Sequence, residues 1–449
     1  SAYVIFNHHR YGDFRSYVLR TRDGGASWQS ISANLPERGS AYSLAEDHVD
    51  GQLLFVGTEF GVFCSLDGGQ NWNALKSGLP VIAVRDLEIQ RRENDLVLGT
   101  FGRGFYVLDD YTPLRQLAST VRSGADAAIF PVKDAWMYVQ SVPLGVRGKG
   151  FQGESYYTAE NPKPGAVITC YLREAPMTPK ERRREREKVL AGKGQDIPYP
   201  SLDSLRREDE QETPHLMCEI RDASGNVVRR LKAPAKKGMV RMHWDMRTAP
   251  YGPIGFQSFD ESFVFDARET GYMVVPGTYT AALFLYDQGN YRSLAQEQRF
   301  SLKPLNNGSL GLADQEASSS FSKELAAFRR TLGAAESLRR DLVEKVKYIR
   351  QALLETPSLQ VRLAGELREI EQQLNRTNER LNGDATRARR EFETLPSVNG
   401  RVGSIVYGLW STTSAPTQTM MTSLETARRE YGEIHHVLND IDARLRAID

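Results

Sequence analysis

Two octapeptides combine a carboxylate, hydroxyl groups, paired glycines and an indole at fixed spacing. TRDGGASW occupies residues 21–28 and SLDGGQNW occupies 65–72, so both fit Ser/Thr-x-Asp-x-Gly-x-x-Trp. An aspartate can serve general acid–base chemistry, or it can accept hydrogen bonds from backbone N–H groups two or three residues on and fasten a turn. The glycines can take positive φ and the tryptophan can lie over the hairpin, so this second use needs no substrate.

The two octapeptides match the Asp box, or BNR repeat, of sialidases and sortilin-type β-propellers. In those families the box lies at the turn between the third and fourth strands of a blade, on the periphery and away from the central ligand channel. The resemblance therefore implies a structural role for the motif residues, which are Thr21, Asp23, Gly25, Trp28, Ser65, Asp67, Gly69 and Trp72.

A second set of polar residues lies at the ends of predicted strands. Glu59 in GTEFG and Arg103 in GTFGRGF occupy near-equivalent points of successive repeats, and Arg85 and Asp86 stand close to a strand start. We expect these side chains either to face a channel or blade top and bind a ligand, or to pair with one another on the surface. Glycoside hydrolysis would need carboxylate pairs, or a tyrosine with arginines, drawn from many blades, so no catalytic residue is assigned.

The histidines and cysteines predict no metal site and no cofactor. His8-His9 and His435-His436 are adjacent pairs rather than the i, i+4 pairs of helical metal sites. Cys64, Cys170 and Cys218 are too scattered for a zinc site. If the strands around Cys170 and Cys218 form a hairpin, the two thiols could bridge in an oxidising compartment, and two buried free thiols are the alternative.

Short strand-like runs separated by Gly, Asp and Asn turns fill residues 1 to about 113. Superposing 42–72 on 84–114 aligns Gly57-Thr58 with Gly99-Thr100, and Asp67 with Asp109, which are 42 residues apart. With 44 residues between Asp23 and Asp67, the period is about 43, and four strands in each such unit are typical of β-propeller blades. The third unit lacks the Gly-Gly and Trp and is predicted to be a terminal blade.

The number of repeats is smaller than a closed ring requires. The region holds about two and a half units, whereas propellers typically close with at least four blades. We expect a longer protein with further blades N-terminal to Ser1, and the alternative is a second chain that supplies them. The start at Ser1, without a signal-type segment, is interpreted as a cut end.

Charge and hydropathy argue against a nucleic-acid partner and against a membrane-spanning helix. The 58 basic and 57 acidic residues give a net charge of +1, which does not support a nucleic-acid partner. Apolar runs such as TYTAALFLY at 278–286 are far shorter than the roughly 18 to 20 residues of a membrane-spanning helix, so no span is expected.

A second region predicts a β-sandwich. Residues 114–162 are expected to be a linker and strap that includes a Gly- and aromatic-rich loop at 146–162. Alternating runs over 163–305 predict an Ig-like antiparallel sandwich of about seven strands. MVRMHWDMR and VVPGTYTAALF resemble the Ig-like domain of flagellar hook-capping proteins, which implies core and corner roles for Trp244 and Tyr279.

Within this sandwich, a polar insertion at 173–214 carries KERRREREKV at 180–189. Its charges alternate in sign and no aromatic residues are interleaved with them. We therefore expect an exposed, helical excursion in preference to a nucleic-acid contact.

From about 315 the apolar residues recur at helical spacing. They predict a long helix through Leu353, a second one over 363–381, a shorter segment at 402–409 and a last helix over 424–445. Residues 315–449 are therefore expected to form a three- or four-helix antiparallel bundle with its own core, and a coiled-coil partner is the alternative.

The whole order, Asp-box repeats ending in GTFGRGFYVLDD, an Ig-like module and a helical tail, resembles the C-terminal part of the sortilin-like, BNR-repeat exported proteins of Bacteroidota. Such proteins are often labelled glycosyl hydrolases. The resemblance implies a multidomain chain, mainly β and then α, in the periplasm, at the outer membrane or outside the cell. Two functions follow: a non-catalytic scaffold whose propeller face binds a protein, peptide or glycan, or a sialidase-like hydrolase whose active site lies mostly before Ser1.

Overall fold

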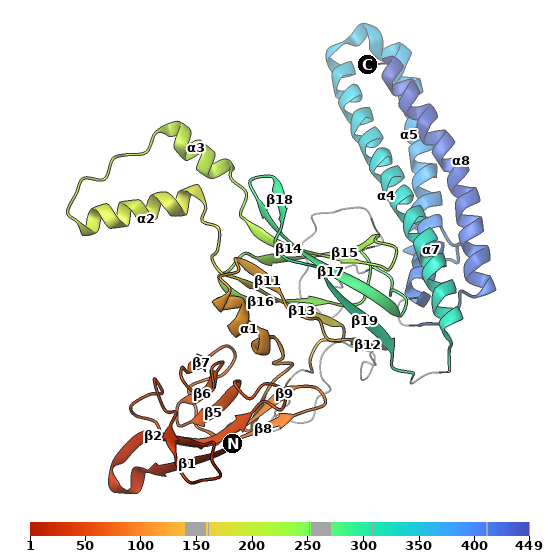
Figure 1. Cartoon of the computed structure of the whole chain (residues 1–449). Coiled ribbons are helices and arrows are strands. Elements are labelled where there is room, and N and C mark those ends of the chain that lie inside the picture. The colour runs from red at the N-terminus through yellow and green to blue at the C-terminus, as the bar shows by residue number, and fades with distance from the viewer. Residues whose placement is uncertain are drawn as a thin grey trace.

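The chain divides into small N-terminal sheets, a pair of packed sheets with a protruding arm, and a C-terminal set of long helices (Figure 1). The computed structural model describes the chain except for residues 140–158, 160, 251, 253–270, 307–308, 410–411 and 449, and it describes residues 357–362 without their side chains.

Three antiparallel sheets follow one another over residues 1–108, each with neighbouring strands in chain order. The first sheet contains β1 (Ala2–His8), β2 (Asp13–Thr21) and β3 (Gln29–Ser30). The second contains β4 (Ala41–Glu46), β5 (Leu54–Thr58), β6 (Gly61–Ser65) and β7 (Asn73–Leu75). The third contains β8 (Val84–Gln90), β9 (Asp95–Thr100) and β10 (Phe105–Leu108).

The three sheets stack in chain order, because each neighbouring pair of sheets shares a buried apolar layer. Val18 of the first sheet packs with Val56 of the second. On the other face of the second sheet, Phe55 packs with Leu96 of the third. The alternation of side chains along β5 thus covers both neighbours, which is why every residue of that strand is buried.

The second and third sheets lie close together at Gly57. A Cβ on Gly57 would lie 2.6 Å from Ser43 Oγ and 2.7 Å from the carbonyl oxygen of Val84. At the corresponding Gly99, the nearest atom would be Asp86 Cβ at 3.4 Å. The Gly-Thr repeat therefore meets two different environments, one closed and one open.

We expect Gly57→Ala to destabilise the sheets by about 1 to 3 kcal/mol, because the backbone of Val84 cannot yield without separating the two sheets. Gly99→Ala is the matched control, and its effect should lie within about 0.5 kcal/mol. Hydrogen exchange of peptides from 41–108 measures both. Equal effects of the two substitutions would refute the close approach.

A buried ionic cluster attaches α1 (Pro113–Arg122) to the second sheet. Arg115 donates two hydrogen bonds to the Asp47 carboxylate, from Nε at 2.8 Å and from Nη2 at 2.7 Å. Tyr111 donates its hydroxyl proton to the same carboxylate at 2.6 Å. The Asp47 side chain is fully buried, so this network joins segments more than 60 residues apart.

The second region consists of two sheets packed face to face. The smaller sheet has the order β11-β13-β16, and the larger has the order β12-β19-β17-β14-β15, with β18 also paired to β17. The strands are β11 (Ala127–Ile129), β12 (Ala135–Met137), β13 (Ala166–Leu172), β14 (His215–Arg221), β15 (Val227–Pro234), β16 (Gly238–Trp244), β17 (Gly277–Asp287), β18 (Asn290–Ser293) and β19 (Gln298–Pro304).

Trp244 occupies the centre of the layer between the two sheets and is fully buried. Its ring meets that of Tyr279 with 5.1 Å between centroids. The Tyr279 hydroxyl donates to the carbonyl oxygen of Val275 at 2.7 Å, four residues upstream. The two residues thus lie in the core and at a strand corner of the packed sheets.

Residues 127–137, expected in a linker, contribute one strand to each sheet. β11 pairs with β13, and β12 pairs in parallel with β19. Each of these strands is only three residues long, which is too short for alternation to show in the sequence. The residues 138 and 139 follow β12, and most of the predicted loop at 146–162 lies outside the described residues.

The strands of Cys170 and Cys218 do not form a hairpin, which was the condition for a bridge between the two thiols, and the alternative of two buried free thiols holds. β13 and β14 lie in different sheets, and Cys170 is opposite Val240 of β16 while Cys218 is opposite Leu283 of β17. Both thiols are free and buried, and burial raises the pKa of each to about 12.

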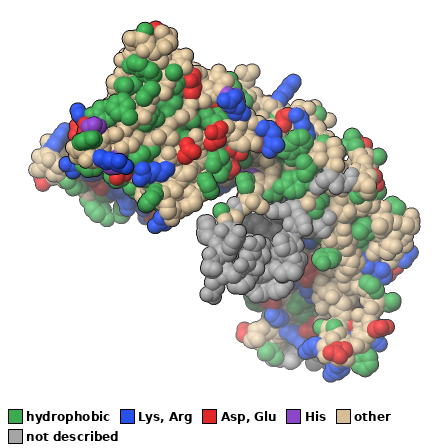
Figure 2. Space-filling model, turned by 90° about the horizontal axis from the view of Figure 1, so that it is seen from below, with side chains coloured by type: hydrophobic (Ala, Val, Ile, Leu, Met, Phe, Trp, Pro, Cys, Tyr) green, Lys and Arg blue, Asp and Glu red, His purple; other side chains and the backbone are tan. Residues whose placement is uncertain are grey.

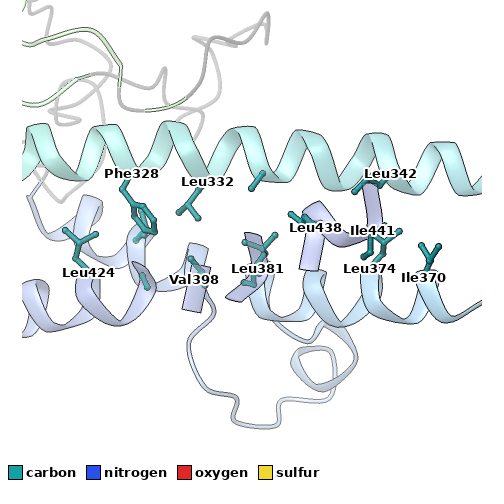
Figure 3. Close-up of a cluster of buried hydrophobic side chains, with 14 of the residues drawn as sticks. Phe328, Leu332, Leu342, Ile370, Leu374, Leu381, Val398, Leu424, Leu438 and Ile441 are labelled. Carbon is teal, nitrogen blue, oxygen red and sulfur yellow. The ribbon is translucent and has the colours of Figure 1, made fainter. Parts of the chain in front are cut away.

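The C-terminal region contains α4 (Leu312–Glu355), α5 (Pro357–Asn382), the one-turn α6 (Ala385–Ala388), α7 (Val398–Leu409) and α8 (Gln418–Ile448). Leu332 of α4, Leu381 of α5, Val398 of α7 and Leu438 of α8 point into one apolar core (Figure 3). α7 begins at Val398, before the start of the predicted segment at 402–409. No helix in the described part of the chain is long and apolar enough to cross a membrane.

Candidate ligand-binding site

The two motif turns connect the last strands of their sheets. Thr21–Trp28 joins β2 to β3, and Ser65–Trp72 joins β6 to β7, the third and fourth strands of the second sheet. In the second turn, Asp67 accepts hydrogen bonds from the backbone and the side chain of Asn71, each at 2.8 Å. The hydroxyl of Ser65 accepts a bond from Gly69 N–H at 2.8 Å, where φ is +91°.

The carboxylates in both turns are held ionised by these local bonds. Partial burial opposes ionisation of Asp67, but the hydrogen bonds from Asn71 and Ser65 hold its pKa below the usual range. At Asp23, bonds from the Ser27 side chain and backbone and from Thr21 lower the pKa well below the usual range. In both turns a backbone donor lies four residues on, and at Asp67 the backbone N–H of Gln70, three residues on as predicted, also lowers the pKa.

The two motif tryptophans differ sharply in burial. Trp72 is 3% exposed, and its Nε1 donates to the carbonyl oxygen of Ile31 at 2.7 Å. Asn34 bonds both the N–H and the carbonyl of Trp72, at 2.7 and 3.0 Å. Trp72 therefore attaches its turn to the preceding sheet instead of covering its own hairpin. Trp28 is 41% exposed.

The four predicted polar residues, which are Glu59, Arg85, Asp86 and Arg103, lie near one end of the second and third sheets. Each of the two sheets has a β-bulge at that end. Ala41 pairs with Thr58 but Ser43 with Gly57, and Val84 pairs with Thr100 but Asp86 with Gly99. Tyr42 and Arg85 are thus the extra residues at the same point of successive sheets. A bulge redirects the side chain of its extra residue, and the end defined by these two residues is called the bulge end below.

Arg85 is the best-positioned cation of the bulge end. Its guanidinium carbon lies 3.9 Å from the centroid of the Tyr42 ring and 5.4 Å from that of Phe101. Phe101 is 70% exposed, and Arg85 is itself exposed. Two aromatic rings therefore hold the guanidinium in place while leaving part of it accessible to solvent.

The turns beside Arg85 have related geometry but different lengths. Glu59 N–H donates to the Ser40 carbonyl at 3.0 Å, and Phe101 N–H donates to the Ala83 carbonyl at 2.9 Å. Phe101 is thus the structural equivalent of Glu59. Arg103 lies further along the longer turn, so Glu59 and Arg103 hold near-equivalent but not identical points of the two sheets.

The expected surface ion pairs among Glu59, Arg85, Asp86 and Arg103 are not formed in the described structure, where all four are resolved. Asp86 instead accepts a bond from Leu87 N–H at 2.9 Å. Arg85 has no carboxylate within ion-pair distance in the described residues. Its positive charge is therefore stabilised by the two aromatic rings and by solvent.

Sequence reasoning missed the aromatic residues of the bulge end. Phe60 and Phe101 each follow closely on a Gly-Thr repeat, which is a signal that the superposed repeats contain. The Phe60 ring lies against Gly39, where φ is +129° and a Cβ would be 2.7 Å from the ring. Hydrophobic side chains lie among charged ones on the face of the N-terminal sheets seen in Figure 2.

The histidine pairs contact aromatic rings. His8 stacks on Tyr11 with 4.5 Å between centroids, and His435 lies 5.8 Å from Tyr431. Within the ranges that the structure describes, no group of three or more His, Cys, Asp and Glu side chains is placed to hold a metal ion.

Comparison with known proteins finds similarity among solved structures alone: no family model and no curated protein matches the chain. The extracellular domain of the one-component system BT4673 from B. thetaiotaomicron matches with 12% identity and a TM-score of 0.17, over 64% of this chain and 28% of that chain. A structure of the same domain from the hybrid two-component system BT4673 matches with 11% identity and a TM-score of 0.17, over 65% and 29%. This chain thus spans less than a third of those chains, and scores this low carry no argument about function.

Proposed function

We propose that residues 1–113 are blades of a β-propeller and that further blades, before Ser1 or on another chain, complete the ring. The burial of Trp72 supports this, because its partners Ile31 and Asn34 lie in the segment that directly follows β3, the last strand of the preceding sheet. Trp28 occupies the same motif position in the first sheet and would need a preceding sheet to be covered in the same way.

The outer faces of the stack support the same proposal. On the first sheet, Val4 and Phe6 are exposed, and on the third sheet Phe105 and Val107 are exposed. Both ends of the stack thus present apolar side chains to solvent. Further sheets would bury them, as the second sheet buries its neighbours.

We further propose that the two packed sheets form an Ig-like sandwich. The bond from the Tyr279 hydroxyl to a backbone carbonyl four residues upstream has the geometry of a tyrosine corner, and Trp244 fills the core beside it. The sandwich and the helices would act as spacer and docking surface for the propeller.

The proposed activity is non-catalytic binding of a protein, peptide or glycan at the bulge end by an exported protein. The observation that carries it is Arg85, an accessible guanidinium that lies over Tyr42 and Phe101 without a carboxylate partner in the described residues. Such a cation can bind a ligand carboxylate, while the rings beside it offer an apolar surface. Export rests on the resemblance stated above.

We expect Arg85→Ala to weaken ligand binding at least tenfold, which corresponds to about 1.4 kcal/mol. Ligands selected from a glycan array with acidic sugars and from a random peptide library provide the probes. Arg22→Ala is the control, since Arg22 is also exposed and forms no ion pair within the described chain. Retention of full affinity in Arg85→Ala would refute the site.

The same protein, assayed on aryl glycosides and sialosides, separates binding from hydrolysis. The proposal expects no turnover. Turnover that Glu59→Gln or Asp86→Asn abolishes would instead establish a hydrolase with these carboxylates in its active site.

A further inference from the structure

The insertion at 173–214 forms an arm that projects from the packed sheets (Figure 1). It contains α2 (Pro179–Gly192) and α3 (Leu202–Glu210), placed between β13 of one sheet and β14 of the other. No residue of α2 is buried, and Glu208 is the one buried residue of α3. The arm therefore has no apolar core of its own.

Local bonds and ion pairs give the arm its shape. Thr178 caps α2 in a reciprocal arrangement with Glu181. Arg183 donates to both oxygens of Glu208 at 2.8 Å and to Glu187 at 2.7 Å. This ionic connection fixes α3 beside α2 but leaves Val189 of α2 and Leu202 of α3 exposed, while Leu190 and Leu205 are half-buried.

An open hollow of about 690 Å³ lies between the two helices. Its lining combines Met177, Val189 and Leu190 with Arg182 and Arg186, whose stems are apolar and whose charged ends reach solvent. Glu185 of α2 and Ser204 and Glu208 of α3 also line the hollow, and Glu208 is already paired with Arg183. Residues 182, 185, 186 and 189 recur at helical spacing, so one face of α2 forms this wall. An open, partly apolar hollow of this kind can accept the apolar face of a short helix.

The segment that enters and forms α3 carries apolar side chains with no cover. Tyr199 is 83% exposed and Leu202 is 66% exposed. The two helices also have opposite net charge: α2 carries six Lys or Arg against three Glu, and α3 carries four Asp or Glu against two Arg. Both halves of a complementary contact are therefore present in one arm.

We infer that the arms of two copies of this chain clasp each other, with α3 of one copy lying in the α2 hollow of its partner. Leu202 enters the apolar part of the hollow, and Asp203 and Glu210 face Arg182 and Arg186 across the contact. A second copy fits better than an unrelated protein, because a two-fold axis places the basic helix of each copy against the acidic helix of the other. The same complementary contact then forms twice. The inference does not depend on the proposed ligand site.

Sedimentation velocity of the whole chain from 1 to 100 µM tests the inference. We expect a concentration-dependent dimer. Arg182→Glu with Arg186→Glu should raise its Kd at least tenfold, and Asp203→Lys with Glu210→Lys should do the same. An equimolar mixture of the two variants should dimerise again, because the reversed charges match.

Arg184→Glu with Lys188→Glu is the control on another face of α2, since these two residues line a separate hollow. This variant should remain a dimer, and circular dichroism should show equal helix content in all three variants. A monomer at every concentration overturns the inference. A dimer that survives both charge reversals overturns it as well, since its contact would then lie elsewhere, as on the exposed faces of the first and third sheets.

Discussion

Asp47→Ala is expected to destabilise the N-terminal sheets by about 3 to 5 kcal/mol. The substitution leaves the Arg115 guanidinium, which is 18% exposed, without the carboxylate that it bonds twice. It also removes the acceptor of the Tyr111 hydroxyl and of the Asp50 N–H. The loss should appear as faster hydrogen exchange in peptides from 41–58 and 105–122.

Two variants sharpen this test. Asp13→Ala removes an exposed ion pair to Arg15 and the acceptor of the Tyr17 hydroxyl from the first sheet, and it should destabilise the protein far less than Asp47→Ala, because solvent screens the exposed pair. Asp47→Asn with Arg115→Met removes both charges and should recover part of the loss, since no unpaired ion remains buried. A cost at Asp47 no larger than that at Asp13 would show that the cluster adds little.

The effect of Asp47 should also depend on pH. Burial opposes ionisation of its carboxyl, but the hydrogen bonds from Arg115, Tyr111 and Asp50 together hold its pKa below the usual range. A carboxyl whose pKa is lowered on folding contributes its full stabilisation of the folded state above its pKa in the unfolded chain, about 3.9. It loses that contribution as the pH falls through its pKa in the folded protein. The difference in unfolding free energy between wild type and Asp47→Ala should therefore be constant at neutral pH and shrink below about pH 4.

Trp72→Ala should cost about 3 to 5 kcal/mol, because it opens a cavity in the layer between the first and second sheets. It also leaves the Ile31 carbonyl without its indole donor and releases the motif turn from the preceding sheet. Trp28→Ala should cost only about 1 kcal/mol in this chain, because its side chain is already 41% exposed. Hydrogen exchange of peptides from 1–75 measures both.

The two tryptophans also test the completion of the ring. In a protein that includes the preceding blade, Trp28→Ala should become as costly as Trp72→Ala, because Trp28 would then be covered. A Trp28 effect that stays small in such a protein would refute the proposed ring, while leaving the Arg85 ligand site to its own test.

Local chemistry was readable from the sequence wherever all partners lie within a few residues. The bonds from Asp67 stay within its octapeptide, and the helical spacing that ends at Leu353 matches α4. Distant partners left no local pattern. The contacts of Trp72 with Ile31 and of Asp47 with Arg115 span 41 and 68 residues, and neither pair is marked by spacing or type.

Only some residues of the candidate site could be predicted from the sequence, for a related reason. Its polar members could be predicted from the superposed repeats. A bulge, however, shifts the pairing of two strands by one residue. A period counted in the sequence does not show which strand carries the extra residue. The pairing of Tyr42 with Arg85 across two sheets follows from those two bulges. Of the two alternatives, surface ion pairs among these residues are not formed in the described structure, and the Arg85 guanidinium lies against two aromatic rings.

The strands β11 and β12 set where this protein can be divided. Each is the edge strand of its sheet, and both precede the residues that form the rest of the two packed sheets. Excision at residue 163 would strip one edge from each sheet and expose the unpaired backbone of β13 and β19, which are then templates for intermolecular strand pairing. The autonomous folding unit therefore starts before Ala127, and Arg241, which donates to the carbonyls of Asp109 and Asp110, ties that unit to the end of the third sheet.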